Sequence, residues 1–237
     1  MKKILDFIDA QLTPTRTCES PFVIGDVHGC GDQFEELILK IYECDRDAEI
    51  FQLGDLIDRG PDLLRVIDLC IEHNVTVIRG NHEQSFLSEF YLGKTCRSKA
   101  RQRTHDQFHH DCNEEEQQRI LTFLSATIPY IHVHTGYNPW ILSHSKIEPS
   151  VGPGSFLNYG TSRRTEITPD DWCFHVHSHQ AWDYEHIEGQ ILNNGQCQIF
   201  NVDAGCCFGG ELLGMRLTDK KIIKVKGYDY CEYPKEN

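Results

Sequence analysis

The chain lacks the features that would direct it to a membrane or to duplex nucleic acid. No apolar run approaches the ~20 residues of a membrane span, and Asp6 and Asp9 interrupt the short apolar stretch near the start of the sequence. Of its 237 residues, 23 are Lys or Arg and 36 are Asp or Glu, so the net charge is -13. Duplex nucleic acid and anionic lipid are bound mainly by basic surfaces. We therefore expect neither partner, no secretion signal and a cytoplasmic protein.

A regular cysteine framework is also lacking. The chain has 11 cysteines, an odd number, and no two of them form a C-x-x-C pair. Secreted disulfide-rich domains are usually shorter and denser in cysteine. We interpret most of these cysteines as free thiols, with Cys206 and Cys207 acting as small buried apolar residues.

One pattern occurs three times in the first eighty residues. A short apolar segment ends in a glycine-containing turn at 21–24, 50–53 and 75–78. After the first two turns, apolar residues recur at helical spacing. Repeated strand, turn and helix is typical of βαβ units with parallel strands. Such sheets bind ligands beyond the carboxyl ends of their strands, which is where these turns lie.

The second half of the chain is rich in predicted strands. They pair as three hairpins, which join 130–134 to 140–143, 190–192 to 198–202 across Asn194-Gly195, and 212–217 to 222–225. No segment between the two halves resembles a linker. We therefore expect a single α/β domain over residues 1–237, with two β-sheets packed face to face.

Residues 93–118 form a polar segment in which a basic stretch precedes an acidic one. Charge runs of this kind are usually a solvated helical surface, and the alternative is a mobile cap near the functional site. We expect the helical insertion to span about 93–125. Its histidines, including His105, are expected to be solvated.

Each of the three turns carries side chains that commonly bind metal ions. They are Asp26 and His28 in the first turn, Asp55 and Asp58 in the second, and Asn81, His82 and Glu83 in the third. Because neighbouring parallel strands end at the same edge of a sheet, these oxygen and imidazole groups can converge on one point. Such a mixture suits manganese, iron or zinc better than a cysteine-based structural zinc site.

The motifs GDVHG (25–29), GDLIDRGP (54–61) and RGNHE (79–83) resemble the three signature blocks of the calcineurin-like metallophosphoesterases. Within that family they are most similar to the PPP-type serine/threonine protein phosphatases, in particular the bacterial and bacteriophage lambda branch. The segment 203–212 also resembles that branch, and the likeness spans about 22–217. The resemblance implies a four-layer α/β fold, in which two mixed β-sheets form a sandwich flanked by helices.

The resemblance also implies a cofactor of two divalent metal ions, with manganese expected first and iron or zinc as alternatives. The implied ligands are Asp26, His28, Asp55, Asn81, His144 and His177. Among them, Asp55 would bridge both ions. His177 stands where the family has Gly-His-Thr, and His179 is the alternative if the register shifts by two residues.

The same resemblance implies a mechanism. A hydroxide that bridges the ions would attack phosphorus in line with the leaving oxygen. His82 would donate a proton to the leaving alkoxide, and Asp58 would orient His82. Arg59, Arg79 and Arg163 would bind the substrate phosphate, because guanidinium groups match its oxygens.

Two enzymatic functions and one non-enzymatic function are compatible with these motifs. We expect a phosphomonoester hydrolase that acts on phosphorylated protein or peptide, with serine, threonine and tyrosine left open. The alternative is a dinucleoside polyphosphate or nucleotide hydrolase of the same fold. Glu83 and Asp58 favour the first, because the resemblance implies that tetraphosphatases often differ at these positions. A metal-holding interaction module without catalysis is disfavoured, since every expected group has a candidate.

Overall fold

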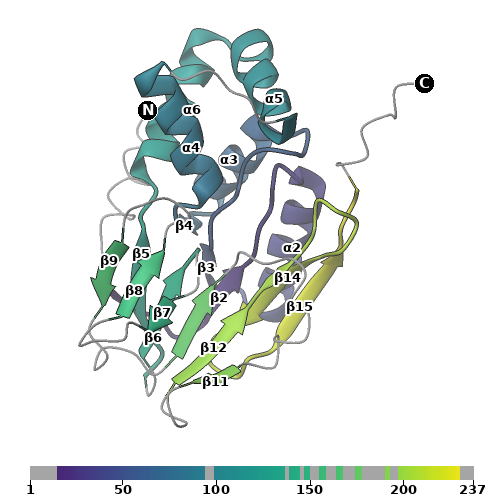
Figure 1. Cartoon of the computed structure of the whole chain (residues 1–237). Helices are drawn as coiled ribbons and strands as arrows, with labels where there is room; N and C mark the ends of the chain where they lie inside the picture. The colour runs from purple at the N-terminus through teal and green to yellow at the C-terminus, as the bar shows by residue number, and fades with distance from the viewer. Residues whose placement is uncertain are drawn as a thin grey trace.

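The computed structural model describes residues 15–93, 99–136, 139–144, 147–149, 155–158, 164–167, 174–177, 190–192 and 197–229. Within these ranges, side chains are described up to residue 144 and again from residue 200. The described elements form a mixed α/β structure, in which two six-stranded sheets are accompanied by helices and by a third, smaller sheet (Figure 1).

The repeated strand–turn–helix pattern builds the centre of one large sheet. Its strands are β2 (Pro21–Ile24), β3 (Glu49–Gln52), β4 (Thr76–Val77), β13 (Asp203–Ala204), β14 (Glu211–Arg216) and β15 (Ile222–Lys226). The order is β13-β14-β2-β3-β4, and β15 pairs with β14. Strands β2, β3 and β4 are parallel, as the sequence predicts, whereas β14 runs antiparallel to β2.

The second large sheet contains the predicted strands of the later chain. Its members are β1 (Thr15–Thr17), β5 (Tyr130–His134), β6 (Pro139–Ser143), β10 (Phe174–His177), β11 (Gln190–Leu192) and β12 (Cys197–Asn201). The antiparallel pairs β5–β6, β11–β12 and β14–β15 confirm the three predicted pairings. The third sheet, which the sequence did not predict, contains β7 (Ile147–Pro149), β8 (Ser155–Asn158) and β9 (Arg164–Ile167).

Helices α2 (Gly31–Cys44) and α3 (Leu63–Glu72) follow the first two turns. In α2, Phe34, Leu37 and Ile38 are buried. Their spacing places them on one helical face, which packs against the first sheet. The helical periodicity predicted after these turns is therefore confirmed.

Apolar residues of β2 pack on both sides of the first sheet. Phe22 and Ile24 join the cluster formed with α2 and α3, whereas Val23 joins Phe51 and Trp140 in the cluster between the two sheets. Successive strand side chains point to opposite faces, so a strand covered on both faces is apolar throughout. This packing fixes the carboxyl ends of β2 and β3, from which the first two turns emerge.

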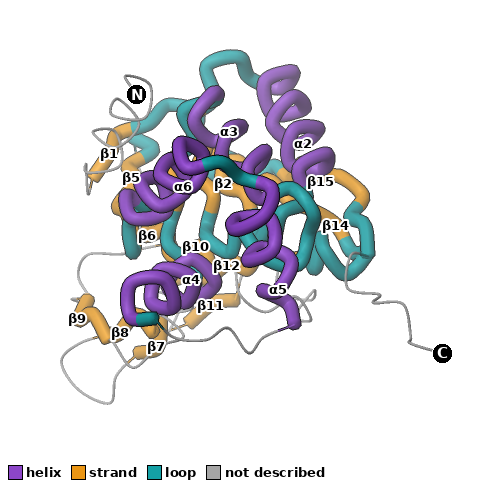
Figure 2. Tube along the Cα trace, turned by 90° about the horizontal axis from the view of Figure 1, so that it is seen from above, coloured by secondary structure: helices purple, strands orange, loops and turns teal. Residues whose placement is uncertain are grey.

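A group of helices lies beyond one end of the sheets (Figure 1). They are α4 (Asn81–Leu92), α5 (Lys99–Asp106), the π-helical turn η1 (Gln107–Asp111) and α6 (Glu114–Ala126). Figure 2 looks down on this group and shows α4 and α5 above the strands. Among the helices that the structure describes, none is long and apolar enough to cross a membrane.

Seven cysteines lie in the described part of the chain with their side chains, and all seven are free thiols. Five of them are buried, including Cys206 and Cys207 as predicted. Burial is the largest of the causes that raise the pKa of Cys18 to about 12, and the hydrogen bond and charge of Glu49 add to it.

We expect Cys18 to react slowly with alkylating reagents in the folded protein. At pH 8, a pKa of about 12 lowers the thiolate fraction by about 10³-fold relative to an ordinary cysteine. Iodoacetamide labelling followed by peptide mass spectrometry measures this, with the less buried Cys44 as the internal control. Native Cys18 labelling as fast as that of Cys44 would contradict the expectation.

Candidate active site

Imidazoles of the first and third turns, together with His144, meet around one carboxylate of the second turn. Asp55 Oδ2 lies 3.8 Å from His28 Nε2 and 3.7 Å from His82 Nε2. Its other oxygen, Oδ1, lies 3.5 Å from His144 Nε2. Asp26 stands beside the same imidazoles, with Oδ2 3.7 Å from His28 Nε2 and Oδ1 3.8 Å from His144 Nδ1. All five residues are buried.

The imidazole nitrogens of this cluster face oxygen acceptors. His144 Nδ1 lies 2.9 Å from the Leu53 carbonyl oxygen, and His144 Nε2 lies 2.9 Å from Asn81 Oδ1. A neutral imidazole has a single N–H, so it can donate to only one of these oxygens. The other nitrogen then directs a lone pair toward an oxygen. Two such lone pairs fit a site in which both atoms bind one cation.

His28 shows the same arrangement. Its Nδ1 lies 3.0 Å from the Ile57 carbonyl oxygen, so the proton of neutral His28 is placed there. Burial is the largest cause that lowers the pKa of His28 to about 3, with the nearby His82 as a second cause. Nε2 therefore presents a lone pair toward the carboxylates of Asp26 and Asp55. Neutral imidazole and carboxylate oxygens are suitable ligands for a divalent metal ion.

His28, Asp55 and His82 each offer one ligand atom within 4.8 Å of the other two. Burial raises the pKa of Asp55, but His144, His82 and His28 outweigh it, so the net shift is downward and the carboxylate is ionised. Opposing causes act on His82: burial lowers its pKa, and Asp55 and Asp58 raise it by more. His28 and His82, which both lie beside Asp55, therefore differ in proton affinity. Such a difference is typical of a site in which one histidine binds a metal ion and another acts as an acid.

His82 is held through its other nitrogen by a buried carboxylate. His82 Nδ1 lies 2.6 Å from Asp58 Oδ2, and Arg101 Nε donates to the same oxygen at 2.9 Å. Burial raises the pKa of Asp58, but His82 and Arg101 outweigh burial and the pKa falls. The predicted Asp58–His82 contact is therefore present, whereas Arg101 was not predicted. Its helix, α5, belongs to the polar segment, which is consequently in contact with the site rather than only a solvated surface.

The backbone of the first and second turns adopts conformations that are uncommon for side-chain-bearing residues. His28, Asp55, Asp58 and Arg59 have positive φ values of 48°, 52°, 73° and 68°. Each such residue costs on the order of 1–2 kcal/mol. Gly80 permits the second and third turns to approach, because a Cβ on it would lie 2.2 Å from Asp55 Oδ1. Backbone strain of this kind is concentrated at functional sites.

Comparison with known proteins agrees with this geometry. Residues 22–212 match the family described as calcineurin-like phosphoesterases. The chain belongs to this family. The family and the fold predicted from the three motifs are thus confirmed. The PPP branch is not specifically supported.

Two groups among the curated relatives of this phosphoesterase differ in how much of the chain they match. The asymmetrical bis(5'-nucleosyl)-tetraphosphatase PrpE of Oceanobacillus iheyensis is 28% identical, over 86% of this chain and 90% of that protein. The serine/threonine-protein phosphatase 1 of Salmonella typhimurium is 45% identical, but over only 28% of this chain and 31% of that protein. The similarity that extends along most of the chain is therefore to the first group.

Solved structures show the same fold. One named provisionally as a diadenosine tetraphosphatase has a TM-score of 0.59 and 18% identity, and the match covers 92% of this chain and 99% of that one. A serine/threonine phosphatase from Saccharomyces cerevisiae has a TM-score of 0.53 and 11% identity, over 99% of this chain and 89% of that one. At these identities the similarity concerns the fold alone.

The arginines predicted to bind phosphate differ in their surroundings. In the phosphoesterase, the Arg59 guanidinium lies 4.7 Å from the Phe208 ring, and among the described residues no acceptor lies within hydrogen-bond distance of Arg59 Nε. Arg79 instead donates from Nε to Thr127 Oγ1 at 2.9 Å and from Nη2 to the Ser125 and Thr127 carbonyl oxygens, both at 2.8 Å. These bonds engage Arg79 with the C-terminal end of α6, as cations near helix C-termini commonly are. The phosphate role of Arg79 stays a prediction.

Three predicted residues have no described side chain. His177 ends β10, which pairs in parallel with β6 and β12, and its register partner on β12 is Asn201. The carboxyl end of β10 therefore adjoins that of β6, the strand that His144 follows. Arg163 and the alternative ligand His179 lie outside the described residues.

Glu83 has a role that the sequence did not reveal. Its two carboxylate oxygens accept hydrogen bonds from the backbone N–H groups of Gly80, Asp55, Leu56 and Ile57, at 2.8, 3.0, 2.9 and 3.2 Å. Burial raises the pKa of Glu83, and the charge of Asp55 raises it further. The side chain thus fastens the second turn to the third.

We expect Glu83→Ala to destabilise the phosphoesterase. It would leave four backbone donors without an acceptor, and each buried unpaired donor costs about 1–3 kcal/mol. Because water would fill part of the space, we expect the free energy of unfolding to fall by about 3–5 kcal/mol. Urea unfolding monitored by circular dichroism measures this, with the exposed Glu72→Ala as the control. Equal stability of the two variants would refute the role of Glu83.

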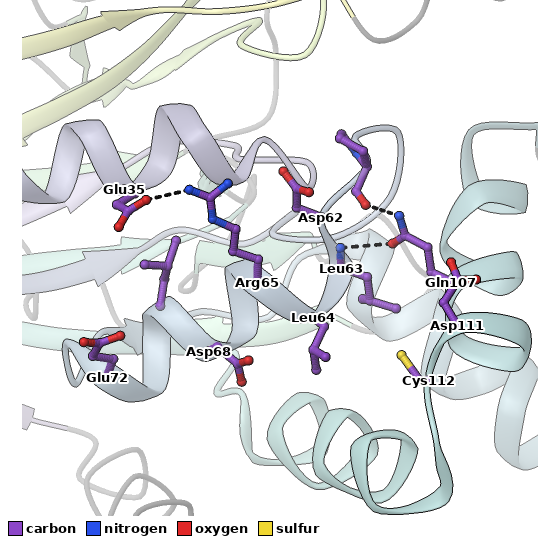
Figure 3. Close-up of a pocket in the computed structure, with 12 residues that line it drawn as sticks. Glu35, Asp62, Leu63, Leu64, Arg65, Asp68, Glu72, Gln107, Asp111 and Cys112 are labelled. Carbon is purple, nitrogen blue, oxygen red and sulfur yellow. Dashed lines mark hydrogen bonds and ion pairs between the residues drawn. The ribbon is translucent and has the colours of Figure 1, made fainter.

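A separate groove of about 530 Å³ lies between α2, α3 and η1 (Figure 3). Arg65 in this groove donates to Glu35 Oε2 at 2.6 Å. Gln107 accepts from the Leu63 backbone N–H at 3.0 Å and donates to the Pro61 carbonyl oxygen. No predicted metal ligand lines the groove. The chemistry is therefore assigned to the cluster at the strand ends.

Proposed function

We propose that this phosphoesterase hydrolyses dinucleoside tetraphosphates. The observation that supports the proposal is the extent of similarity: the asymmetrical tetraphosphatases match over 86% of the chain, whereas the protein phosphatase matches over 28%. The motifs around the metal ligands are shared by enzymes of both kinds, but substrates are bound largely by residues outside such motifs. Asp58 and Glu83 alone favour a phosphoprotein substrate, and the extent of similarity reverses this preference.

The residues that would hold two divalent ions are Asp26, His28, Asp55, Asn81, His144 and His177. Manganese remains the expected metal, with iron or zinc as alternatives. When bound, such ions supply Lewis acidity toward phosphate oxygens and lower the pKa of water. The converging lone pairs of His28, His144 and the two carboxylates fit this cofactor.

The remaining groups orient the substrate and move a proton. Arg59 would bind a phosphate oxygen through its guanidinium group. His82 would hold a proton on Nε2 and donate it to the leaving oxygen. Asp58 accepts from His82 Nδ1, which fixes the ring orientation and stabilises the charged imidazole. Arg163 stays a further candidate for phosphate binding.

The test compares substrates after the metal is stripped and Mn²⁺ is added back. Diadenosine tetraphosphate, p-nitrophenyl phosphate, a phosphoserine peptide and a phosphotyrosine peptide are assayed in parallel. We expect kcat/KM for the tetraphosphate to exceed that for either peptide by at least about tenfold, which corresponds to 1.4 kcal/mol. Chromatography should show ATP and AMP as products. A phosphopeptide hydrolysed with the higher kcat/KM would overturn the proposal.

A phosphoprotein phosphatase is the second candidate, and the His82–Asp58 pair favours it. A serine alkoxide is a poor leaving group that needs a proton in the transition state, whereas a phosphate leaving group needs one less. A buried histidine whose pKa is raised by two carboxylates is suited to the first case. The same substrate comparison decides between the two functions.

A further inference from the structure

Asp58, the partner of His82, is itself held from the polar segment. Asp58 is 1% exposed, and its Oδ2 is the acceptor for both His82 and Arg101. Oδ1 has no hydrogen-bond partner among the described residues. Within the part of the chain that the structure describes, the orientation of this carboxylate therefore depends on these two donors.

Arg101 is fixed on its other side by α4. It is 7% exposed, and its Nη1 donates to Glu89 Oε1 at 2.5 Å. His105 Nε2, one turn further along α5, lies 3.1 Å from Glu89 Oε2. His105 is therefore engaged rather than solvated, contrary to the sequence prediction. A guanidinium that uses Nε and Nη1 for two different carboxylates has little freedom to turn.

Two hydrogen bonds to the backbone of Arg59 connect the same helix to the second turn. The Arg59 N–H donates to the Ala100 carbonyl oxygen at 2.9 Å, and Arg103 Nη1 donates to the Arg59 carbonyl oxygen at 2.6 Å. Arg59 follows Asp58 directly and shares its positive φ. Helix α5 thus contacts both the side chain and the backbone of the segment that orients His82.

We propose that Arg101 is a positioning residue for the Asp58–His82 pair, through which helix α5 contributes to proton donation without touching the substrate. The proposal rests on hydrolysis of a phosphate ester or anhydride by this site and holds for either candidate substrate. Without Arg101, Asp58 Oδ2 would keep His82 as its one donor. The carboxylate could then rotate so that either of its oxygens faces His82. The guanidinium charge also offsets the burial of Asp58, so the carboxylate remains a charged acceptor for His82.

The test uses Arg101→Leu, assayed on aryl phosphates whose leaving groups range from 2,4-dinitrophenol to phenol. Partners that orient a ligand or catalytic histidine typically contribute about 10–100-fold. We expect kcat on phenyl phosphate to fall by that factor, kcat on 2,4-dinitrophenyl phosphate to change little, and KM to stay the same. Arg101→Lys should be intermediate, because one ammonium cannot reach both carboxylates in the same geometry. An equal loss on every leaving group would refute the positioning role.

Two further variants separate positioning from folding. Arg65→Leu is the matched control, because Arg65 also bridges two carboxylates, Asp32 and Glu35, away from the site. It should leave the leaving-group dependence unchanged. Glu89→Gln weakens the ion pair that holds Arg101 without removing Arg101. We therefore expect a smaller change in the leaving-group dependence, in the same direction. This variant keeps the proposal testable if Arg101→Leu folds poorly. A leaving-group dependence in Glu89→Gln identical to that of the wild type would count against the proposal.

A double-mutant cycle and a spectroscopic measurement test the route through Asp58. If Arg101 acts through Asp58, adding Arg101→Leu to Asp58→Asn should cause little further change in the leaving-group dependence. Additive effects would refute that route. In zinc-loaded enzyme, the NMR signal of the His82 Nδ1 proton should shift or broaden in Arg101→Leu and stay in place in Arg65→Leu. An unchanged His82 signal in Arg101→Leu would overturn the proposal even if no aryl phosphate is hydrolysed.

Failure of this proposal and failure of the proposed function have different signatures. Wild-type enzyme that hydrolyses aryl phosphates but prefers phosphopeptides over the tetraphosphate contradicts the substrate proposal and leaves the Arg101 measurements interpretable. An enzyme that prefers the tetraphosphate but shows no effect of Arg101 on leaving-group dependence contradicts only the role of Arg101.

Discussion

Asp55→Asn is expected to remove bound metal and to abolish hydrolysis. Asp55 is the residue whose two oxygens face His28, His82 and His144 at 3.5–3.8 Å. The amide has the same size, but it carries no charge and offers one acceptor oxygen in place of two. Since metal-bound charge stabilisation is worth several kcal/mol, we expect kcat to fall by about 10³-fold or more. Metal analysis by mass spectrometry after dialysis should show less than the full complement.

A matched control separates this effect from loss of an acidic side chain in general. Asp68→Asn alters a half-exposed carboxylate on α3 that pairs with Arg119 at 3.3 Å. Its metal content and kcat should equal those of the wild type. An Asp55→Asn variant that keeps both full metal content and full activity would show that the site is not organised around Asp55.

His82→Asn is expected to keep the metal and to slow turnover. His82 bonds Asp58 through Nδ1 and directs Nε2 toward the cluster, 3.7 Å from Asp55 Oδ2. The raised pKa of His82 favours a protonated ring, which is suited to donate a proton. Loss of a general acid should lower kcat by about 10²–10⁴-fold on a substrate with a poor leaving group. On 2,4-dinitrophenyl phosphate the loss should be much smaller.

The control for this variant is His110→Asn, which removes an exposed histidine of η1. Both proteins are assayed on phenyl phosphate and on 2,4-dinitrophenyl phosphate, and their metal content is measured. If His82→Asn hydrolyses phenyl phosphate at the wild-type rate, His82 is not the acid. If it loses the metal instead, His82 is a ligand.

The convergence of the candidate ligands could be predicted because they are local in the sequence. Asp26, His28, Asp55 and Asn81 each stand a few residues beyond a short apolar strand. The parallel order of those strands brings their carboxyl ends together. The fold class and the pairing of later strands followed in the same way from apolar periodicity and turn residues.

The network behind His82 could not be predicted in this way. Arg101 lies 43 residues from Asp58 in the chain, in a segment almost without apolar residues, so no periodicity indicates which side of α5 is buried. Glu89 lies on α4 and resembles an ordinary surface glutamate. The position of Arg79 is also set by tertiary structure, because its acceptors are the last carbonyl groups of α6. Contacts of this kind depend on how helices dock.

The substrate was the least predictable property. Residues such as Asp58, His82 and Glu83 belong to motifs that perform metal-assisted phosphoryl chemistry, and this chemistry is shared by enzymes with different substrates. Similarity along most of the chain extends beyond these motifs. It therefore shifts the proposal from phosphoproteins to dinucleoside tetraphosphates, with the motif chemistry unchanged.

We propose that side chains from separate strand ends hold two neighbouring divalent ions. The most direct test is anomalous diffraction from a crystal of the manganese-loaded protein, collected at the manganese absorption edge. We expect two adjacent peaks, one ligated by Asp26 and His28, the other by Asn81 and His144, with Asp55 between them. A fully loaded crystal with no peak among these side chains, or with a single peak that leaves no space beside it, would show that they do not form a two-metal site.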